Sequence, residues 1–219
     1  MNTSFTEENY LKVIYHLSAD DNQQVNTNRI ASALNTKPAS VTDMIKKLSG
    51  KSLINYQPYQ GVGLTEEGKT IALKVVRKHR LWEFFLVEKL AFGWDEVHEL
   101  AEQLEHIQSA KLMNRLDEFL GFPAYDPHGD PIPDQNGAIK TCIMKPVAVL
   151  QAGEAGTICG VKEHSPLFLQ YLEKIDLKIG RKISVEEIIA FDETVIIKME
   201  NGQKMNISKE AAKNILITL

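Results

Sequence analysis

The chain has 219 residues, 43% of them hydrophobic and 25% charged, and its formal net charge at pH 7 is −4. This composition is ordinary for a soluble globular protein, and the length allows one large domain or two to three small ones. No apolar run of roughly 18 residues occurs in the sequence, which excludes a transmembrane helix.

The polar N-terminus has no charged-then-apolar targeting pattern, and the two cysteines, Cys142 and Cys159, form no CxxC pair. We therefore expect a cytoplasmic protein without a disulfide framework. Residues 1–80 carry 11 Lys and Arg against 7 Asp and Glu, whereas the remainder carries 14 against 22. A basic first third and an acidic remainder suit a DNA-contacting domain followed by a cation-binding one.

The first three predicted elements are helices. Residues 5–19 have apolar side chains at helical spacing, with Glu7 and Glu8 in the first turn. A short helix capped by Thr27 follows, and a turn at residues 35–38 leads into a third helix. The third helix has one apolar face and one polar, basic face, which is typical of a helix-turn-helix.

Residues 53–72, LINYQPYQGVGLTEEGKTIA, predict a strand, a glycine-containing turn, a second strand and a helix capped at Thr65. A hairpin at this place is the wing of a winged helix. It favours DNA binding over the alternative of a solvated basic helix on a helical protein. The candidate phosphate contacts in and beside the wing are Lys51, Tyr56, Tyr59 and Gln60.

A long helix over residues 65–90, a break at 91–93, and helices over 94–105 and 110–120 come next. Residues three and four apart share a helix face, so these helices can present rows of metal ligands. The candidates are His79 and Glu83 on the first helix and His98, Glu102, Glu105 and His106 on the second. Carboxylate and imidazole ligands suit Mn(II), Fe(II), Co(II) or Zn(II), and a zinc site of the thiolate kind is not expected, because no cysteine lies near.

The apolar surface of these helices exceeds what a lone bundle exposes, which favours a homodimer. Residues 121–140 are rich in proline and glycine and predict an ordered loop or linker that carries Asp126 and His128. Strand patterns and one short helix over residues 146–219 predict a small β-barrel. The predicted fold is mainly α with small β elements.

Six segments together resemble the diphtheria-toxin-repressor and manganese-transport-regulator family of metal-dependent transcriptional repressors: EENYLKVIYHL, PASVTDMIKKL, YQGVGLTEEGK, RKHRLWEFFL, VHELAEQLEH and DPHGDPIP. The resemblance covers essentially the whole chain. It implies a winged helix-turn-helix domain at 1–72, a metal-binding and dimerisation domain at 73–140 and a FeoA-like small β-barrel at 146–219. It also implies a homodimer on palindromic operator DNA, with no enzyme activity, membrane or small-molecule substrate.

The resemblance implies two metal sites that order the N-terminal helix and set the spacing of two DNA-reading heads. The primary site would use Asn9, Glu102, Glu105 and His106. The second site would use His79, Glu83 and His98. Some relatives carry Cys-Pro-His where this chain has Asp126-Pro127-His128. These relatives suggest further ligands at Asp126, His128 and Glu163.

Iron-sensing relatives carry Met and Cys where this chain has Asn9 and Glu102, and manganese-sensing relatives carry Asp and Glu. A carbonyl oxygen and a carboxylate are harder ligands and favour Mn(II). Fe(II) is the alternative, and Zn(II) or Co(II) are expected to substitute in vitro. Lys12 stands where some manganese sensors carry a second acid, which argues against a binuclear site of that type.

On DNA, side chains at the front of the third helix are expected to meet base edges and those around them to contact phosphates. The predicted DNA-contacting residues are Thr36, Lys37, Pro38, Ala39, Ser40, Thr42, Asp43, Lys46, Lys47 and Tyr59. The predicted function is metal-dependent repression of metal-uptake genes.

Two other functions are possible from the residues alone. The first is a metallohydrolase with an open metal position for water. No Ser/His/Asp or Cys/His set and no phosphate-binding glycine loop accompanies the ligands, which argues against it. The second is a metal-independent DNA-binding dimer with a structural metal.

Overall fold

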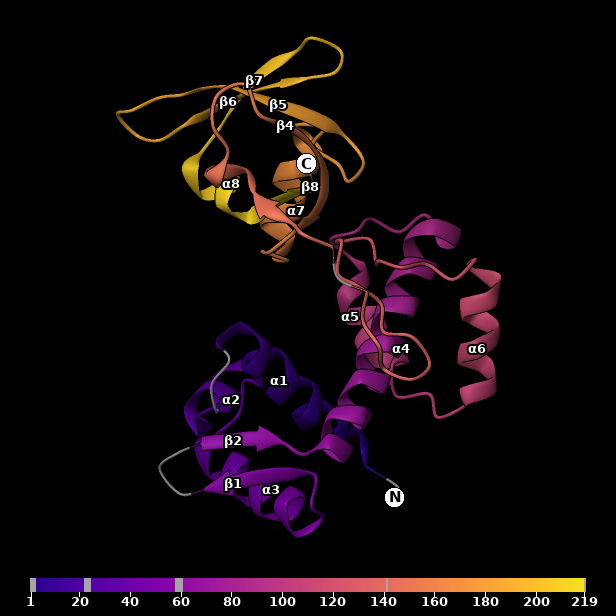
Figure 1. The fold of residues 1–219 in the computed structure, drawn as a ribbon. Helices are drawn as coiled ribbons and strands as arrows, with labels where there is room; N and C mark the ends of the chain where they lie inside the picture. The colour runs from indigo at the N-terminus through magenta and orange to yellow at the C-terminus, as the bar shows by residue number, and fades with distance from the viewer. Residues whose placement is uncertain (1–2, 22–24, 58–60, 141, 219) are drawn as a thin grey trace. The chain divides into compact units, whose positions relative to one another are not determined.

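The structure is a computed structural model that describes residues 3–21, 25–57, 61–140 and 142–218 (Figure 1). It consists of two compact units, each considered by itself. The first is formed by Met1–His79, Glu102–Glu118 and Pro133–Ala138, and the second by Arg80–Ala101, Phe119–Ile132 and Ile139–Leu219. The predicted middle segment, 73–140, is shared between the units, and the three-domain division remains a prediction.

The first unit contains the predicted winged helix. Its elements, labelled in Figure 1, are α1 (Phe5–Asp21), α2 (Thr27–Ala33), α3 (Pro38–Gly50), β1 (Ile54–Gln57) and β2 (Gly61–Leu64). β1 and β2 pair antiparallel with Ile54 opposite Leu64, which makes the expected hairpin after α3. The expectation that Thr27 caps α2 is wrong, because the Asn26 side chain accepts the hydrogen bond of the Arg29 N–H at 2.8 Å.

One aliphatic core holds the winged helix together. Leu11 and Ile14 of α1, Ile30 of α2, and Ile45 and Leu48 of α3 are all fully buried in it. Burial of each such side chain contributes roughly 1.5–3 kcal/mol. The exposed side of α3 is therefore set by the packing of its opposite face.

Three helices follow the wing: α4 (Glu66–Leu90), α5 (Val97–Leu104) and α6 (Ala110–Phe119). Thr65 caps α4 as predicted, because its Oγ1 accepts the Gly68 N–H at 3.1 Å. Gly68 permits close packing there, since a Cβ at that position would lie 1.9 Å from the Leu53 carbonyl oxygen. α4 ends before Ala91, which has a φ of 57°.

Helix α5 is shorter than the predicted helix over 94–105. Its last residue is Leu104, and Glu105 and His106 lie in the turn that follows. The prediction that both residues continue the helical row of His98 and Glu102 is therefore wrong. The turn after Leu104, and not the period of the α-helix, sets the directions of these two side chains.

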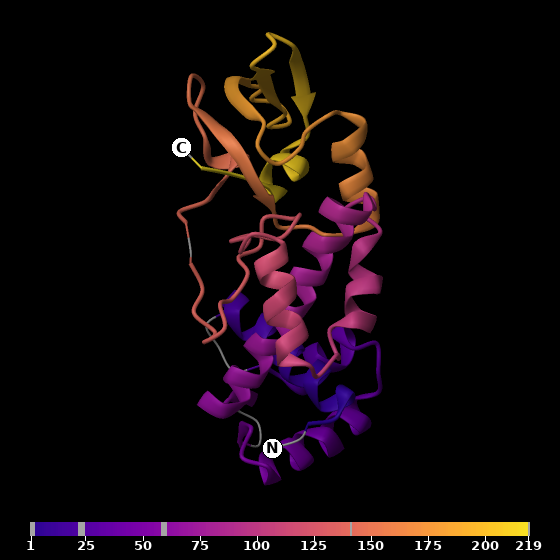
Figure 2. The ribbon, with the colours of Figure 1, turned by 90° about the vertical axis from the view of Figure 1, so that its right-hand side faces the viewer.

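The second unit contains a six-stranded sheet with short helices beside it (Figure 2). Its elements are β3 (Lys145–Pro146), η1 (Val147–Val149), β4 (Ala155–Val161), α7 (Pro166–Lys174), β5 (Lys182–Ile188), β6 (Val195–Met199), β7 (Lys204–Ile207), α8 (Lys209–Asn214) and β8 (Ile215–Thr218). The strand order is β3-β8-β4-β5-β6-β7. β3 and β7 are the end strands, so closure of the sheet into a barrel remains a prediction.

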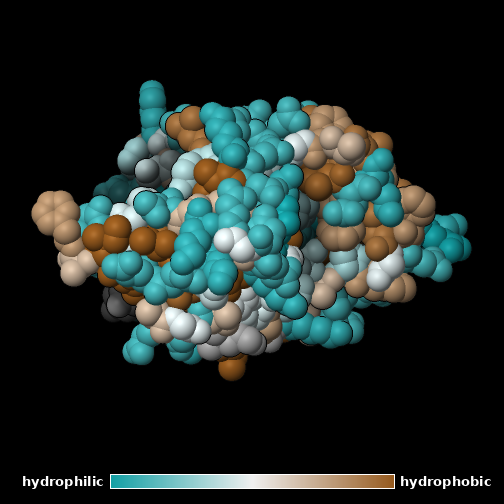
Figure 3. Space-filling model, turned by 90° about the horizontal axis from the view of Figure 1, so that it is seen from above, coloured by the Kyte–Doolittle hydropathy of each residue, from teal (hydrophilic) through white to brown (hydrophobic). Residues whose placement is uncertain are grey.

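A second aliphatic core lies in this unit and includes Leu169, Leu172 and Ile197. On the outside, hydrophobic groups are scattered among hydrophilic ones on the face in Figure 3, as on most protein surfaces. Among the described residues, no helix is long and apolar enough to cross a membrane.

Glu7 joins α1 to α3 inside the first unit. Its carboxylate lies 2.7 Å from Lys51 Nζ and 3.2 Å from Lys47 Nζ, and it accepts the Ser4 N–H at 2.8 Å. Burial alone would raise the pKa of Glu7, but these three partners lower it to about 2. A lowered pKa means that the ionised carboxylate stabilises the fold above about pH 4.5, and that this stabilisation is lost as the pH falls towards 2.

Glu7→Gln is expected to lower the free energy of unfolding at pH 7 by about 1–2 kcal/mol, after allowance for solvent screening. The difference from the unmutated protein should shrink as the pH falls below about 4.5, where the carboxylate takes up a proton. Urea unfolding followed by circular dichroism measures both effects. Asp43→Asn, an exposed acid-to-amide change on α3, is the control. Equal stabilities of Glu7→Gln and the unmutated protein at pH 7 would contradict this role.

Candidate metal centre

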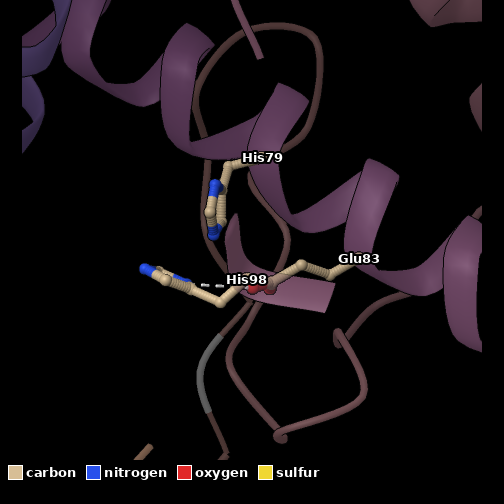
Figure 4. Close-up of side chains that lie close together, drawn as sticks. All are labelled: His79, Glu83 and His98. Atoms are coloured by element: carbon tan, nitrogen blue, oxygen red, sulfur yellow. Dashed lines mark hydrogen bonds and ion pairs between the residues drawn. The ribbon is translucent and has the colours of Figure 1, made fainter. Parts of the chain in front are cut away.

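Helix α4 places His79 and Glu83 one turn apart. It is one continuous helix, so its own geometry fixes these two residues relative to each other. In the second unit, His98 Nδ1 lies 3.3 Å from Glu83 Oε1, as Figure 4 shows. His79, Glu83 and His98 each offer a donor atom for a cation. These residues are the predicted second site.

A second group of ligands shares Glu83. Asp126 and His128 come from the loop between α6 and β3, and their donor atoms lie within 4.8 Å of one another and of Glu83. All three side chains are buried. His128 Nε2 lies 2.8 Å from the Trp94 carbonyl oxygen, which can only accept, so Nε2 carries the proton. Nδ1, 3.7 Å from Glu83 Oε2, is therefore the nitrogen that can face a cation.

The local sequence explains how this loop holds its ligands. Asp126 Oδ1 accepts the backbone N–H groups of His128 and Asp130, both at 2.9 Å, which closes a tight turn. Gly129 has a φ of 90°, and a Cβ there would lie 2.1 Å from the Cys159 carbonyl oxygen. The loop therefore packs directly on β4, and a larger residue at 129 would displace it.

Burial and neighbouring charges shift the pKa values of the groups around Glu83. Burial, followed by the charges of Asp130 and Glu83, raises the pKa of Asp126 to about 7, although Arg80 and His128 oppose the rise. Burial alone would lower the pKa of His128, but its interaction with Glu83 and the charge of Asp126 raise it to about 9. At neutral pH, His128 therefore holds a proton beside Glu83. A divalent cation at the same place would balance the charges of the carboxylates.

Glu163, the further ligand suggested by the sequence, lies outside both groups. Its carboxylate accepts the Ser165 N–H at 2.7 Å, before α7. The neighbouring His164 lies near these ligands, since its ring centroid is 5.1 Å from that of His128. His164 Nε2 lies 3.2 Å from the Val161 carbonyl oxygen. Ligation by Glu163 remains a prediction.

The predicted primary site lies in the first unit, around Glu105. This carboxylate is fully buried, and its Oε2 lies 2.7 Å from His79 Nδ1. Asn9 Oδ1 is also buried and has no hydrogen-bond partner among the described residues. Leaving a buried acceptor unpaired costs about 1–3 kcal/mol, so the amide oxygen and Glu105 both fit a cation.

Two side chains that the sequence did not assign to this site enter it from α1. Lys12 Nζ lies 2.7 Å from Glu105 Oε1 and 3.3 Å from Glu102 Oε1. Glu8 Oε2 lies 3.0 Å from His106 Nδ1. The structure therefore brings His106 to Glu8 and brings Glu105 to Lys12 and His79.

The positions of these residues along α1 are the sequence signal that points to them. Glu8 and Lys12 stand four apart, and Asn9 and Lys12 three apart, so Lys12 lies next to each of them on the surface of α1. Burial alone would raise the pKa of Glu105, but its hydrogen bond with His79 and the charge of Lys12 lower it. The buried carboxylate is thus ionised beside a cation of the chain itself.

Most of the predicted DNA-contacting residues lie on α3 or just before it. Those that are exposed are Thr36, Lys37, Pro38, Ala39, Ser40, Asp43, Lys46 and Lys47. Thr42 is half-buried and donates its hydroxyl to the Pro38 carbonyl oxygen at 3.0 Å. Lys47 and Lys51 already pair with Glu7. Tyr59 and Gln60 lie outside the described residues.

Family models match three consecutive stretches of the chain. Residues 2–62 match the iron dependent repressor N-terminal DNA binding domain, and residues 65–134 its metal binding and dimerisation domain. Residues 145–219 match the FeoA domain. An uncharacterized HTH-type transcriptional regulator of Methanocaldococcus jannaschii is 40% identical over 113 residues, 52% of this chain and 90% of that protein. The chain belongs to the diphtheria-toxin-repressor family of metal-dependent transcriptional repressors.

Other members of the family are also similar. A solved manganese-dependent transcriptional repressor in complex with manganese is 33% identical, with a TM-score of 0.85 over 97% of this chain and 99% of that one. The iron-dependent repressor IdeR of Mycobacterium tuberculosis is 34% identical over 128 residues, 58% of this chain and 55% of that protein. Members of this family are DNA-binding repressors and not enzymes, so the metallohydrolase alternative is excluded.

In this repressor, Arg80 supports the loop that carries Asp126 and His128. Its guanidinium donates to the Pro131 carbonyl oxygen at 2.5 Å and lies 3.5 Å from Asp126 and 3.2 Å from Asp130. Removing one partner of a buried ion pair leaves an uncompensated charge. We therefore expect Arg80→Met to lower the free energy of unfolding of the metal-free protein by about 3–5 kcal/mol.

Urea unfolding in the presence of EDTA measures this loss. The matched control is Arg115→Met, because Arg115 is exposed and pairs with Glu118 on the surface of α6. Exposed pairs of this kind contribute roughly 0–1 kcal/mol. A loss in Arg80→Met no larger than in Arg115→Met would show that Arg80 does not stabilise the loop.

Proposed function

We propose that this repressor is activated by Mn(II) and then binds a palindromic operator as a homodimer, which represses metal-uptake genes. The observation that carries the proposal is the group of Glu83, Asp126 and His128, three buried ligands in a chain that also has a winged helix. Buried carboxylates and imidazoles are costly without a counter-charge, which supports a cation as their partner.

Glu83 is the central ligand of the proposed centre. Asp126 and His128 complete it from the loop, and His98 and His79 add nitrogen donors from α5 and α4. A divalent cation there would supply positive charge that neutralises the two carboxylates. The chain's contribution is orientation, because the Trp94 carbonyl fixes the tautomer of His128 and the turn at Asp126 fixes its loop.

Manganese is favoured by the hardness of the ligands. Within the described residues, both ligand groups contain only carboxylate oxygens and imidazole nitrogens, with no sulfur ligand of the softer kind. The 33%-identical repressor solved with manganese supports the same choice. Fe(II) is the alternative, because relatives 34% identical over 128 residues are named iron-dependent repressors.

Coupling to DNA is proposed to use α4. Its first turn packs beneath the winged helix at Gly68 and Leu53, and the same continuous helix carries His79 and Glu83. A cation that binds one arrangement of these parts better than another favours that arrangement. The coupling is reciprocal, so operator DNA should tighten metal binding by the same factor by which metal tightens DNA binding.

Exposed aromatic residues support the homodimer. Phe92, Phe119 and Phe122 of the second unit are all exposed, and Lys89 lies 5.6 Å from the centre of the Phe119 ring. Apolar residues of this size are unfavourable in water, and a two-fold interface would cover them. The division into domains at 1–72, 73–140 and 146–219 is part of the same proposal.

The proposal predicts metal-dependent binding to operator DNA. A gel shift with Mn(II) should be lost on adding EDTA, and Glu83→Gln should weaken binding in Mn(II) about tenfold or more. Glu88→Gln, an exposed acid-to-amide change on α4, is the matched control and should bind like the unmutated protein. Titrations with Mn(II) and Fe(II) under anaerobic conditions compare the two metals. Binding that survives EDTA unchanged would favour the metal-independent DNA-binding dimer instead.

The exposed Lys46 of α3 is expected to contact a phosphate. Lys46→Ala should weaken binding equally for operator and non-operator DNA and should reduce the slope of log K against log salt by about 1. Fluorescence anisotropy at several salt concentrations measures both. Lys111→Ala, on α6, is the control. An unchanged salt slope in Lys46→Ala would remove Lys46 from the DNA interface.

A further inference from the structure

Lys12 is one of the few lysines buried in this chain. It stands on α1, and its ammonium reaches Glu102 and both oxygens of Glu105, at 3.3, 2.7 and 2.8 Å. Glu105 is fully buried, so its charge needs a permanent partner. α1 therefore brings its own cation to the carboxylates predicted to form the primary metal site.

The surroundings of this pair differ from those of an ordinary structural ion pair. Glu105 also faces His79 at 2.7 Å, and Asn9, one turn before Lys12, has a buried oxygen without a hydrogen-bond partner among the described residues. Carboxylate, imidazole and amide oxygen groups of this kind are combined in metal-ion sites. The ammonium of Lys12 thus lies among metal ligands, whereas Lys51 contacts a single acid, Glu7.

We propose that Lys12 is the resident cation of the Glu102–Glu105 site, where it docks α1 in the place of a divalent metal ion. This inference rests on the proposed function and deepens it. The Glu102–Glu105 site does not load metal while Lys12 is present, and the centre around Glu83 carries the metal response. Lys12 is then the residue that sets the number of regulatory metal ions.

Charge explains why the ammonium and a metal ion exclude each other. An ammonium is a compact cation with three donors, which suits two neighbouring carboxylates. A divalent ion bound to the same oxygens would lie within a few ångströms of the ammonium and be repelled by it. Displaced from the carboxylates, Lys12 would be left buried without its counter-ions, which is unfavourable.

The inference is tested by counting bound Mn(II). Purified full-length protein is dialysed to equilibrium against Mn(II) alone, and metal per chain is measured. Lys12→Met and Lys12→Gln remove the charge, and the second keeps a polar group beside Glu105 in case the first does not fold. Each folded variant is expected to bind one more Mn(II) per chain than the unmutated protein. Lys69→Gln, an exposed lysine of α4, should show no increase.

Two further measurements locate the added ion. The double variant Lys12→Gln with Glu105→Gln should lose the additional Mn(II), because the buried carboxylate is then absent. In EDTA, Lys12→Gln should melt at a lower temperature than the unmutated protein, and Mn(II) should raise its melting temperature by more. An unchanged Mn(II) count in the folded Lys12 variants would overturn the inference.

Failure of the proposed function gives a different result. In that case Glu83→Gln would bind as much Mn(II) as the unmutated protein, whatever the Lys12 variants do. If only the inference about Lys12 fails, Glu83→Gln still loses Mn(II), and the Lys12 variants gain none.

Discussion

The buried carboxylate of Glu83 is the constraint on which the site depends. It lies on α4 and faces His98 and His128, and burial makes its charge costly unless a cation or proton compensates it. Positive charge comes from a protonated His128, whose pKa is raised to about 9, and from Arg80 beside Asp126. This arrangement keeps the loop on α4.

The carboxylates of the two units are compensated in different ways. Glu105 has a full counter-ion from the chain, Lys12, together with His79. Glu83 faces His128, whose proton would be released if a metal ion bound in its place. On our proposal, Lys12 balances the Glu105 site with the chain's own charge, whereas the Glu83 site takes up a divalent cation. This difference is the physical basis for giving the two sites different roles.

Local sequence signals predicted most of the fold. The cap at Thr65, the break after Leu90 and the hairpin between residues 54 and 64 all depend on neighbouring residues, and all are confirmed. The family resemblance is confirmed as well. The end of α5 at Leu104 was not predicted, because no proline or glycine marks it and the apolar pattern continues.

The contacts of the candidate ligands were harder to predict than the candidates themselves. Spacing along α4 and α5 indicated candidate ligands, but His106 contacts Glu8 and Glu105 contacts Lys12, both on α1 and more than ninety residues earlier. Such contacts depend on tertiary packing, which periodicity in one segment cannot report. From the sequence, Lys12 only replaces an acid that some manganese sensors carry, whereas its contacts with Glu102 and Glu105 are those of a counter-ion.

Anomalous diffraction at the manganese edge, from crystals of the full chain grown with Mn(II), tests the central claim most directly. The account predicts a strong peak among Glu83, Asp126 and His128. It predicts no peak between Glu102 and Glu105, where the Lys12 ammonium should remain. A manganese peak at Glu105 together with none at Glu83 would contradict the assignment of the metal response to the Glu83 centre.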